Sequence, residues 1–281
     1  MTEAAQDLPT TSSGPTLWMA TANDRKLLRC VLPAAGLTDD VLVAHEASGF
    51  GSALFAAGGE VLQVKRPVEA GAALGPLLGP EVRAVRQVGC LVRSDSGTPP
   101  RSETVPPFRH KGWVMAMTGD VPPLPQVPEG SEEHALLQRN LRAHTGPEAV
   151  AHLIISRVYR SASQRALSAA ALVEMVNGVL RPLESASFGR WVAVLTSETI
   201  GVVINRGGAV HFRTVERVRR CVQCSPDGAR DFDGVNHPHL RGAAVVSGEA
   251  SYMPPGPGWR VLGANEALVL ENDAPAKRID G

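Results

Sequence analysis

A block of helical spacing between two blocks of short apolar segments is the feature that most constrains the fold of this chain. Apolar residues recur at three- and four-residue intervals within 131–180, most clearly over 164–180. On either side, short apolar runs bounded by Gly and Pro are typical of strands. The run 113–117 (WVMAM) ends on the turn 118–120 (TGD), and we expect it to deliver that turn into a cleft. Strands, then helices, then strands favour an α+β domain with helices packed against antiparallel sheets.

The N-terminal segment differs from the rest of the chain. Residues 1–14 are polar and offer nothing to bury, so they are expected to form a disordered lead before one domain over 15–281. This lead has neither the basic start nor the apolar centre of a secretory signal. No apolar run is long enough to cross a bilayer. We therefore expect a cytoplasmic protein without a membrane partner.

The charge balance excludes a strong general attraction to polyanions. Lys plus Arg and Asp plus Glu both total 28, which gives a formal net charge of zero. A basic cluster of Arg213, Arg217, Arg219 and Arg220 has little aromatic interleaving, so it is interpreted as a solvated strand and turn. Nucleic acid is therefore not an expected partner, and no motif indicates a cofactor.

One pair of cysteines has a spacing used by metal sites. Cys221 and Cys224 form a CxxC motif, and His237 and His239 follow in a polar stretch. Two thiolates and two imidazoles can bind zinc tetrahedrally, although His-x-His is tighter than the usual spacing and no second CxxC exists. A redox pair and two unrelated strand-end cysteines remain alternatives. Four cysteines in 281 residues do not form a disulfide framework.

Six local motifs, in order along the chain, resemble one family. Three lie before the helices. Residues 17–23 (LWMATAN) look like its opening strand; 48–51 (SGFG), with the Gly58-Gly59 turn, are similar to its Asp-Gly-Trp-Gly hairpin; and 92–97 (VRSDSG) resemble its Val-Arg-x-Ala-Thr-x-Gly segment, one residue short. The family is the class II glutamine amidotransferases, which are N-terminal-nucleophile hydrolases with a four-layer αββα fold.

The other three motifs complete the resemblance from about Thr16 to the C-terminus. Residues 107–119, with Pro107-Phe108, Trp113 and Thr118-Gly119, resemble the family's His-Pro-Phe strand ending in Asn-Gly. Residues 145–148 (TGPE) look like its Ser-Asp-Thr-Glu turn, and 245–249 (VVSGE) with Gly258-Trp259 look like its closing strand and following Trp. The resemblance implies a four-layer αββα sandwich.

The resemblance also implies a chemistry. An N-terminal Cys attacks the glutamine carboxamide, with its own α-amine as base. An Asn side chain and a Gly N–H stabilise the oxyanion. An Arg binds the substrate carboxylate, and an Asp binds the substrate amine.

Most of these roles lack their residue in this chain. The nucleophile position falls near Pro15 or Thr16, and no Cys precedes Cys30. Thr118 stands where the family has Asn, Pro106 where it has His, and Gly146 where it has the amine-binding Asp. Two matching residues remain, listed here with the roles that the resemblance implies: Arg93 as a carboxylate anchor and Gly119 as an N–H donor.

The sequence therefore predicts a catalytically inactive, amidotransferase-like binding or regulatory module. Its partner would be a protein, or a small carboxylate ligand bound at Arg93, Thr118 and Gly119. One enzymatic alternative is an amidohydrolase or glutaminase that uses Thr16 after removal of the preceding residues. Another alternative is an interaction module stabilised by zinc in the 221–239 region. Purely structural roles are also possible: Arg93 as a solvated or structurally paired side chain, and Gly119 kept for a positive φ.

Overall fold

The computed structural model describes most of the chain. The described residues are 16–38, 42–44, 47–56, 58–69, 72–73, 83–93, 100–162, 167–185, 188–221, 224, 235–249, 252–272 and 274–281. The expected disordered lead, residues 1–14, lies outside the described residues, as does Pro15.

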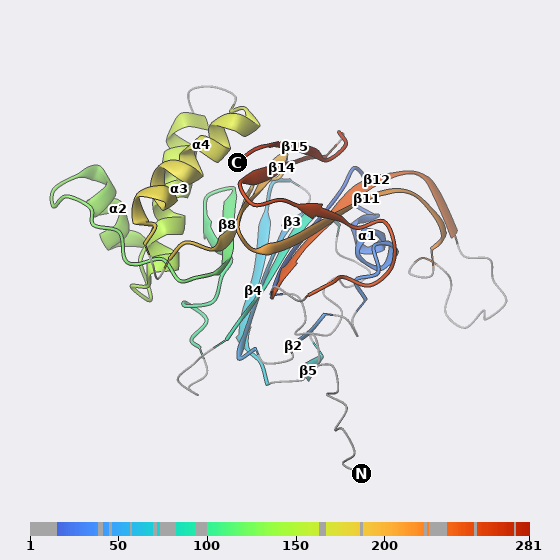
Figure 1. Ribbon diagram of the computed structural model, residues 1–281, viewed down its shortest axis with the longest axis horizontal. Coiled ribbons are helices and arrows are strands. Elements are labelled where there is room, and N and C mark those ends of the chain that lie inside the picture. Colours follow the sequence, from blue (N-terminus) through green and yellow to red (C-terminus); the bar gives the residue numbers. More distant parts are fainter. Residues whose placement is uncertain are drawn as a thin grey trace, which may run out of the picture.

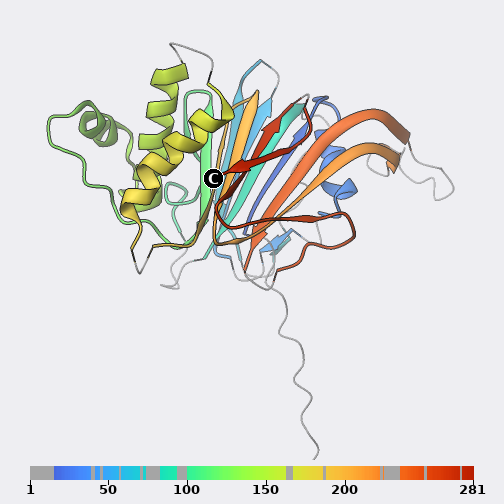
Figure 2. The same cartoon turned by 45° about the horizontal axis from the view of Figure 1, so that its top comes forward.

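Two antiparallel sheets face each other at the centre of the molecule (Figures 1 and 2). The first sheet has the order β13-β11-β12-β1-β6-β3-β4 and the second β15-β14-β10-β9-β8-β7. The first comprises β1 (Leu17–Ala22), β3 (Gly49–Ala56), β4 (Val61–Pro67), β6 (Ala84–Val92), β11 (Ala209–Cys221), β12 (Val235–Gly248) and β13 (Arg260–Leu262). The second comprises β7 (Phe108–His110), β8 (Trp113–Gly119), β9 (Trp191–Thr196), β10 (Ile200–Arg206), β14 (Glu266–Glu271) and β15 (Lys277–Asp280). A separate pair joins β2 (Val43–Ala44) to β5 (Ala72–Ala73).

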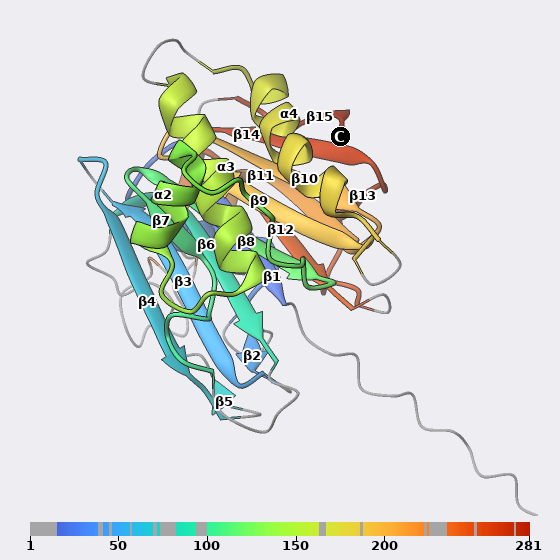
Figure 3. The ribbon, with the colours of Figure 1, turned by 90° about the vertical axis from the view of Figure 1, so that its left-hand side faces the viewer.

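Helices cover the outer face of each sheet. The helix α1 (Leu28–Ala34) packs against the first sheet, and Figure 3 shows α3 (Gly146–Ala162) and α4 (Ala169–Leu180) lying over the second. The helix α2 (Glu132–Asn140) packs beside α3, and a 3₁₀ turn, η1 (Arg181–Leu183), follows α4. The predicted α+β, four-layer αββα sandwich is confirmed. No helix within the described ranges is long and apolar enough to span a membrane.

The strand β1 illustrates why the core strands are apolar throughout. Leu17 and Met19 point between the two sheets, whereas Trp18 and Ala20 point toward α1. Successive side chains of a strand face opposite sides. A strand in an inner layer therefore needs apolar residues at every position, and its sequence does not alternate.

A buried arginine ties the two sheets together. The guanidinium of Arg86, on β6, donates hydrogen bonds to Thr196 Oγ1 at 3.0 Å, to the Leu270 carbonyl at 3.0 Å and to Asn272 Oδ1 at 3.0 Å. Its side chain is fully buried, and burial lowers its pKa to about 9. The group is still charged at neutral pH, so these acceptors solvate a cation inside the protein.

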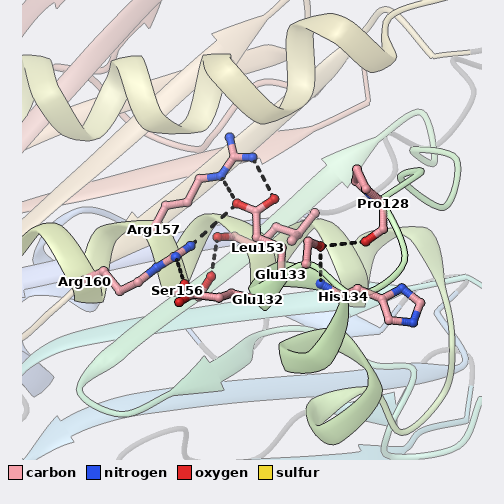
Figure 4. Close-up of polar contacts among 9 residues, drawn as sticks. Pro128, Glu132, Glu133, His134, Leu153, Ser156, Arg157 and Arg160 are labelled. Atoms are coloured by element: carbon pink, nitrogen blue, oxygen red, sulfur yellow. Dashed lines mark hydrogen bonds and ion pairs between the residues drawn. The ribbon is translucent and has the colours of Figure 1, made fainter.

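The helical layer is fixed by caps and ion pairs. Ser131 begins α2 by accepting the backbone N–H of His134. Arg157 of α3 then donates to both carboxylate oxygens of Glu133 at 2.8 and 3.2 Å, and Arg160 pairs with Glu132 at 2.9 Å (Figure 4). These contacts fasten α2, which buries little apolar surface of its own, to α3.

Candidate functional site

Three of the predicted site residues line one hollow of about 250 Å³, where β1 of the first sheet lies close to β8 of the second. Thr16 directly precedes β1, and Thr118 and Gly119 end β8. The other lining residues come from the adjoining strand ends: Asp120, Arg190, Trp191, Val192, Gly207, Gly208, Ala209, Ser247, Gly248 and Glu249. Sequence reasoning missed Arg190, whereas Asp120, Ser247 and Glu249 belong to motifs that it had quoted.

The hydroxyl groups of Thr16 and Thr118 hydrogen-bond to each other, and that of Thr16 also bonds to the backbone. Thr118 Oγ1 donates to Thr16 Oγ1 at 3.1 Å, and Thr16 Oγ1 donates to the Ser247 carbonyl at 3.3 Å. The backbone N–H of Thr16 donates to the same carbonyl at 2.8 Å. A hydroxyl nucleophile needs a base that can take its proton, and a peptide carbonyl is not one.

The turn after β8 is held by the segment that enters β9. Asp120 Oδ2 accepts the backbone N–H groups of Arg190 at 2.8 Å and Gly189 at 3.1 Å, and these bonds lower the Asp120 pKa. Gly119 has a φ of +102°, and a Cβ there would lie 2.5 Å from the Arg190 carbonyl oxygen. The positive φ expected at Gly119 is thus present and the turn favours glycine, while its role as an N–H donor stays a prediction.

Arg93 adjoins the hollow through an ion pair. Its guanidinium contacts the carboxylate of Glu249, one of the lining residues, and about 45% of each side chain is exposed. The Glu249 carboxylate thus occupies the place at Arg93 where the carboxylate of a bound ligand would pair. This geometry fits the alternative in which Arg93 is structurally paired. The Arg93 side chain nevertheless lies close enough to the hollow to contact a ligand there.

Proline carbonyl groups fill the space beside two glycines, Gly146 and Gly51. A Cβ at Gly146, where the family has its amine-binding Asp, would lie 1.8 Å from the Pro122 carbonyl oxygen. Similarly, the Pro106 carbonyl oxygen lies 1.8 Å from where a Cβ would be at Gly51. The proline-rich segments on either side of β7 and β8 therefore pack directly against glycines, and no side chain fits at Gly146 without backbone movement.

A second polar cluster lies far from this hollow along the chain. Cys30, Cys221, Cys224 and His237 place their ligand atoms within 4.8 Å of one another. Three of the four predicted zinc candidates are thus together, but the prediction that His239 joins them is wrong. His239 is exposed, and its carbonyl accepts a hydrogen bond from the Asn23 side chain at 3.0 Å. The position in the cluster is taken by Cys30 of α1.

The cysteines lie away from the nucleophile position that the resemblance implies. None lies among the described residues that line the hollow. Cys90 is buried between the sheets, and burial raises its pKa to about 12. Burial and the neighbouring Cys221 and Cys224 likewise raise the pKa of Cys30. A thiol must ionise to attack, so both environments oppose reactivity.

Three solved structures are similar to this chain over 94% of its length. A glutamine aminotransferase class-II domain protein from Silicibacter pomeroyi has a TM-score of 0.52, is 16% identical and is covered over 98%. A predicted glutamine amidotransferase from Pseudomonas aeruginosa has a TM-score of 0.52, is 14% identical and is covered over 96%. The allosteric regulatory enzyme of purine biosynthesis has a TM-score of 0.54 and is 15% identical, with 48% of that longer chain covered.

No protein-family model and no curated protein sequence matches this chain. At these identities the structural likeness speaks for the fold and not for the activity. The chain therefore has the αββα fold of the class II glutamine amidotransferases, the N-terminal-nucleophile hydrolase type.

Proposed function

We propose that this protein is a catalytically inactive, class II amidotransferase-like module that binds a small carboxylate-bearing ligand in the hollow beside Thr16. The observation that carries the first half is the hydrogen-bond chain from Thr118 through Thr16 to the Ser247 carbonyl. In this chain the Thr16 hydroxyl, at the nucleophile position, bonds to the Thr118 hydroxyl, at the oxyanion position. None of its members is a base.

Three separate requirements of glutamine hydrolysis lack support in this geometry. Among the described residues, Thr16 Oγ1 donates to the Ser247 carbonyl, which is not a base, and the Thr16 backbone nitrogen donates to the same carbonyl. Thr118 has a shorter side chain than Asn, and its hydroxyl donates to Thr16. Gly146 has no carboxylate for a substrate amine, and Pro122 leaves no room for one. Restoring any one of these groups leaves the other two missing.

The features that ligand binding requires, a hollow and positively charged side chains, are in contrast present. A hollow of about 250 Å³ accommodates part or all of an amino-acid-sized ligand, and Arg93 and Arg190 provide positive charge at its edge. The ion pair between Arg93 and Glu249 is half-exposed, and such pairs contribute only about 0.2–1 kcal/mol. A ligand carboxylate that forms a two-pronged contact with Arg93 can therefore displace Glu249 at small cost.

Intact-mass spectrometry tests the loss of catalysis. The purified protein is weighed before and after incubation with diazo-oxo-norleucine, a glutamine analogue that alkylates amidotransferase nucleophiles. We expect no adduct, no removal of residues 1–15 and no release of ammonia from glutamine. A chain that begins at Thr16, or an adduct near it, would instead establish an N-terminal-nucleophile hydrolase.

Calorimetry with L-glutamate and L-glutamine as probes tests the binding half. Arg93→Met should abolish the binding of both probes. Arg25→Met is the matched control, because Arg25 also forms a half-exposed ion pair, with Glu198 at 2.7 Å. Unchanged binding in Arg93→Met, or no binding by the wild-type protein, contradicts the small-carboxylate proposal and points to a protein partner instead.

A further inference from the structure

The cluster of Cys30, Cys221, Cys224 and His237 has the dimensions of a tetrahedral zinc site. Cys30 Sγ lies 3.4 Å from Cys224 Sγ and 3.8 Å from His237 Nε2. With Zn–S near 2.3 Å and Zn–N near 2.0–2.1 Å, a tetrahedron separates two sulfurs by about 3.8 Å and a sulfur from a nitrogen by about 3.6 Å. These two distances are close to the tetrahedral values, and all four ligand atoms lie within 4.8 Å of one another, so modest shifts would let them share one ion.

The fold brings these residues together from three elements. Cys30 lies in α1, Cys221 ends β11, Cys224 follows it, and His237 lies near the start of β12. Position 221 pairs with position 235, which is two residues before His237. Alternate residues of a strand share a face, so Cys221 and His237 lie on the same side of the β11–β12 ribbon. Register irregularities between 216 and 221 adjust this end of the ribbon.

We propose that Cys30, Cys221, Cys224 and His237 bind one structural Zn²⁺ ion that fastens the end of the β11–β12 ribbon to α1. Four protein ligands close the coordination sphere, which is the arrangement of structural rather than catalytic zinc. Figures 1 and 2 show the ribbon extending past the neighbouring strands, with α1 beneath it. The ion anchors this extension to the body of the domain.

The surroundings of the cluster suit a charged metal site. Three thiolates and one neutral imidazole would leave a zinc centre with one negative charge. Arg29 Nη2 donates to Cys224 Sγ at 3.5 Å, which provides a cation and a second-shell hydrogen bond. Cys30 and Cys221 also border a hollow of about 310 Å³, which gives an ion access to the buried ligands.

A disulfide explains the cluster less well. All four cysteines are free, and the Cys30 and Cys224 sulfurs at 3.4 Å are well beyond the ~2.05 Å of a disulfide bond. A disulfide would also use only two of the three sulfurs and give no role to His237. The proposal does not depend on the ligand or the activity of the hollow beside Thr16.

Metal content of the purified full-length protein is the first test. Native mass spectrometry and a chelator-based colorimetric assay should find about one zinc ion per chain. Replacement by Co²⁺ should give the intense visible absorption of a tetrahedral thiolate site, which reports coordination without any mutation. Protein with no zinc and no such cobalt spectrum, or with two thiols joined in a disulfide, overturns the proposal.

Ligand variants then test the assignment of residues. Cys30→Ser and His237→Asn should each lose zinc or bind it much more weakly. His239→Asn is the matched control, because this neighbouring histidine is outside the cluster, and it should retain a full complement. Zinc retained by both ligand variants, or lost from His239→Asn alone, contradicts the assignment. If a ligand variant fails to fold, the cobalt spectrum of the wild-type protein still decides whether the site exists.

Discussion

The two polar clusters of this protein are built at opposite ends of the same strand, β12, and they differ in completeness. Near its C-terminal end, Ser247 lies in the hollow beside Thr16. There the groups that glutamine hydrolysis would need are replaced by other residues, hydrogen-bonded to one another or excluded by backbone atoms. Near its N-terminal end, His237 joins three thiols whose ligand atoms converge within 4.8 Å. The stability of the αββα scaffold depends on neither cluster's chemistry alone, because it comes from apolar layers and from contacts such as those of Arg86.

The largest effect should come from the cysteine cluster. Cys221→Ser is expected to lower the free energy of unfolding by more than about 4 kcal/mol, because losing a structural metal releases the end of the ribbon from α1. Urea denaturation of wild-type protein with a chelator should show a comparable loss, while His239→Asn stays within about 0.5 kcal/mol. Equal stability with and without chelator would remove the contrast between the two clusters.

The second effect tests whether backbone closes the position of Gly146, where the resemblance places an amine-binding side chain. Gly146→Ala should destabilise the protein by about 2 kcal/mol or more, because its Cβ would meet the Pro122 carbonyl oxygen at 1.8 Å. Gly178→Ala is the matched control, since this glycine lies in α4 with nothing within 4 Å of its Cβ. It should gain roughly 0.5–1 kcal/mol from helix propensity. Thermal unfolding of both variants measures the two effects. An unchanged melting temperature for Gly146→Ala would mean that the backbone at Pro122 can move to accommodate a side chain.

The elements that sequence predicted well are those fixed by local rules. The Gly58-Gly59 turn and its two strands follow from turn chemistry, and the strand over 113–117 follows from its apolar run. Local rules alone do not fix the start of α1. Asn23 and Asp24 are both suitable cap residues by type, but the Asp24 carboxylate accepts the Lys26 N–H and the helix begins at Leu28 without a side-chain cap. A short turn that satisfies its own donors competes with a cap.

The parts of the two clusters that sequence missed are non-local. Cys30 and Cys224 are 194 residues apart, so spacing within 221–239 could suggest zinc but could not find the ligand supplied by α1. The exclusion of side chains at Gly146 depends likewise on where the segment at Pro122 is packed. The order of the motifs along the chain located the hollow, because that order matches the order of the strands that line it. The hydrogen bonds inside the hollow could not be predicted, because they depend on how distant segments pack together.

A smaller effect should come from the turn that shapes the hollow. Asp120→Ala removes the acceptor of two backbone N–H groups and should cost about 1 kcal/mol, because water replaces the carboxylate at this exposed site. The folded-state pKa of Asp120 is lowered, so its contribution is present at neutral pH and is lost as the pH falls through that pKa, below about 4. Denaturation at several pH values should show the gap between wild type and Asp120→Asn closing in acid. A gap independent of pH contradicts this role for the carboxylate.

The smallest effect on stability, and the most informative one for the hollow, should come from Glu249→Gln. The pair with Arg93 is half-exposed, so its loss should change the free energy of unfolding by less than about 1 kcal/mol. The same change removes the internal competitor for the Arg93 guanidinium and should tighten L-glutamate binding several-fold in calorimetry. Glu198→Gln breaks the similar pair with Arg25 and should leave binding unaltered. Weaker binding in Glu249→Gln would show that this carboxylate contacts the ligand directly, so that the hollow recognises a cationic group of the ligand rather than its carboxylate.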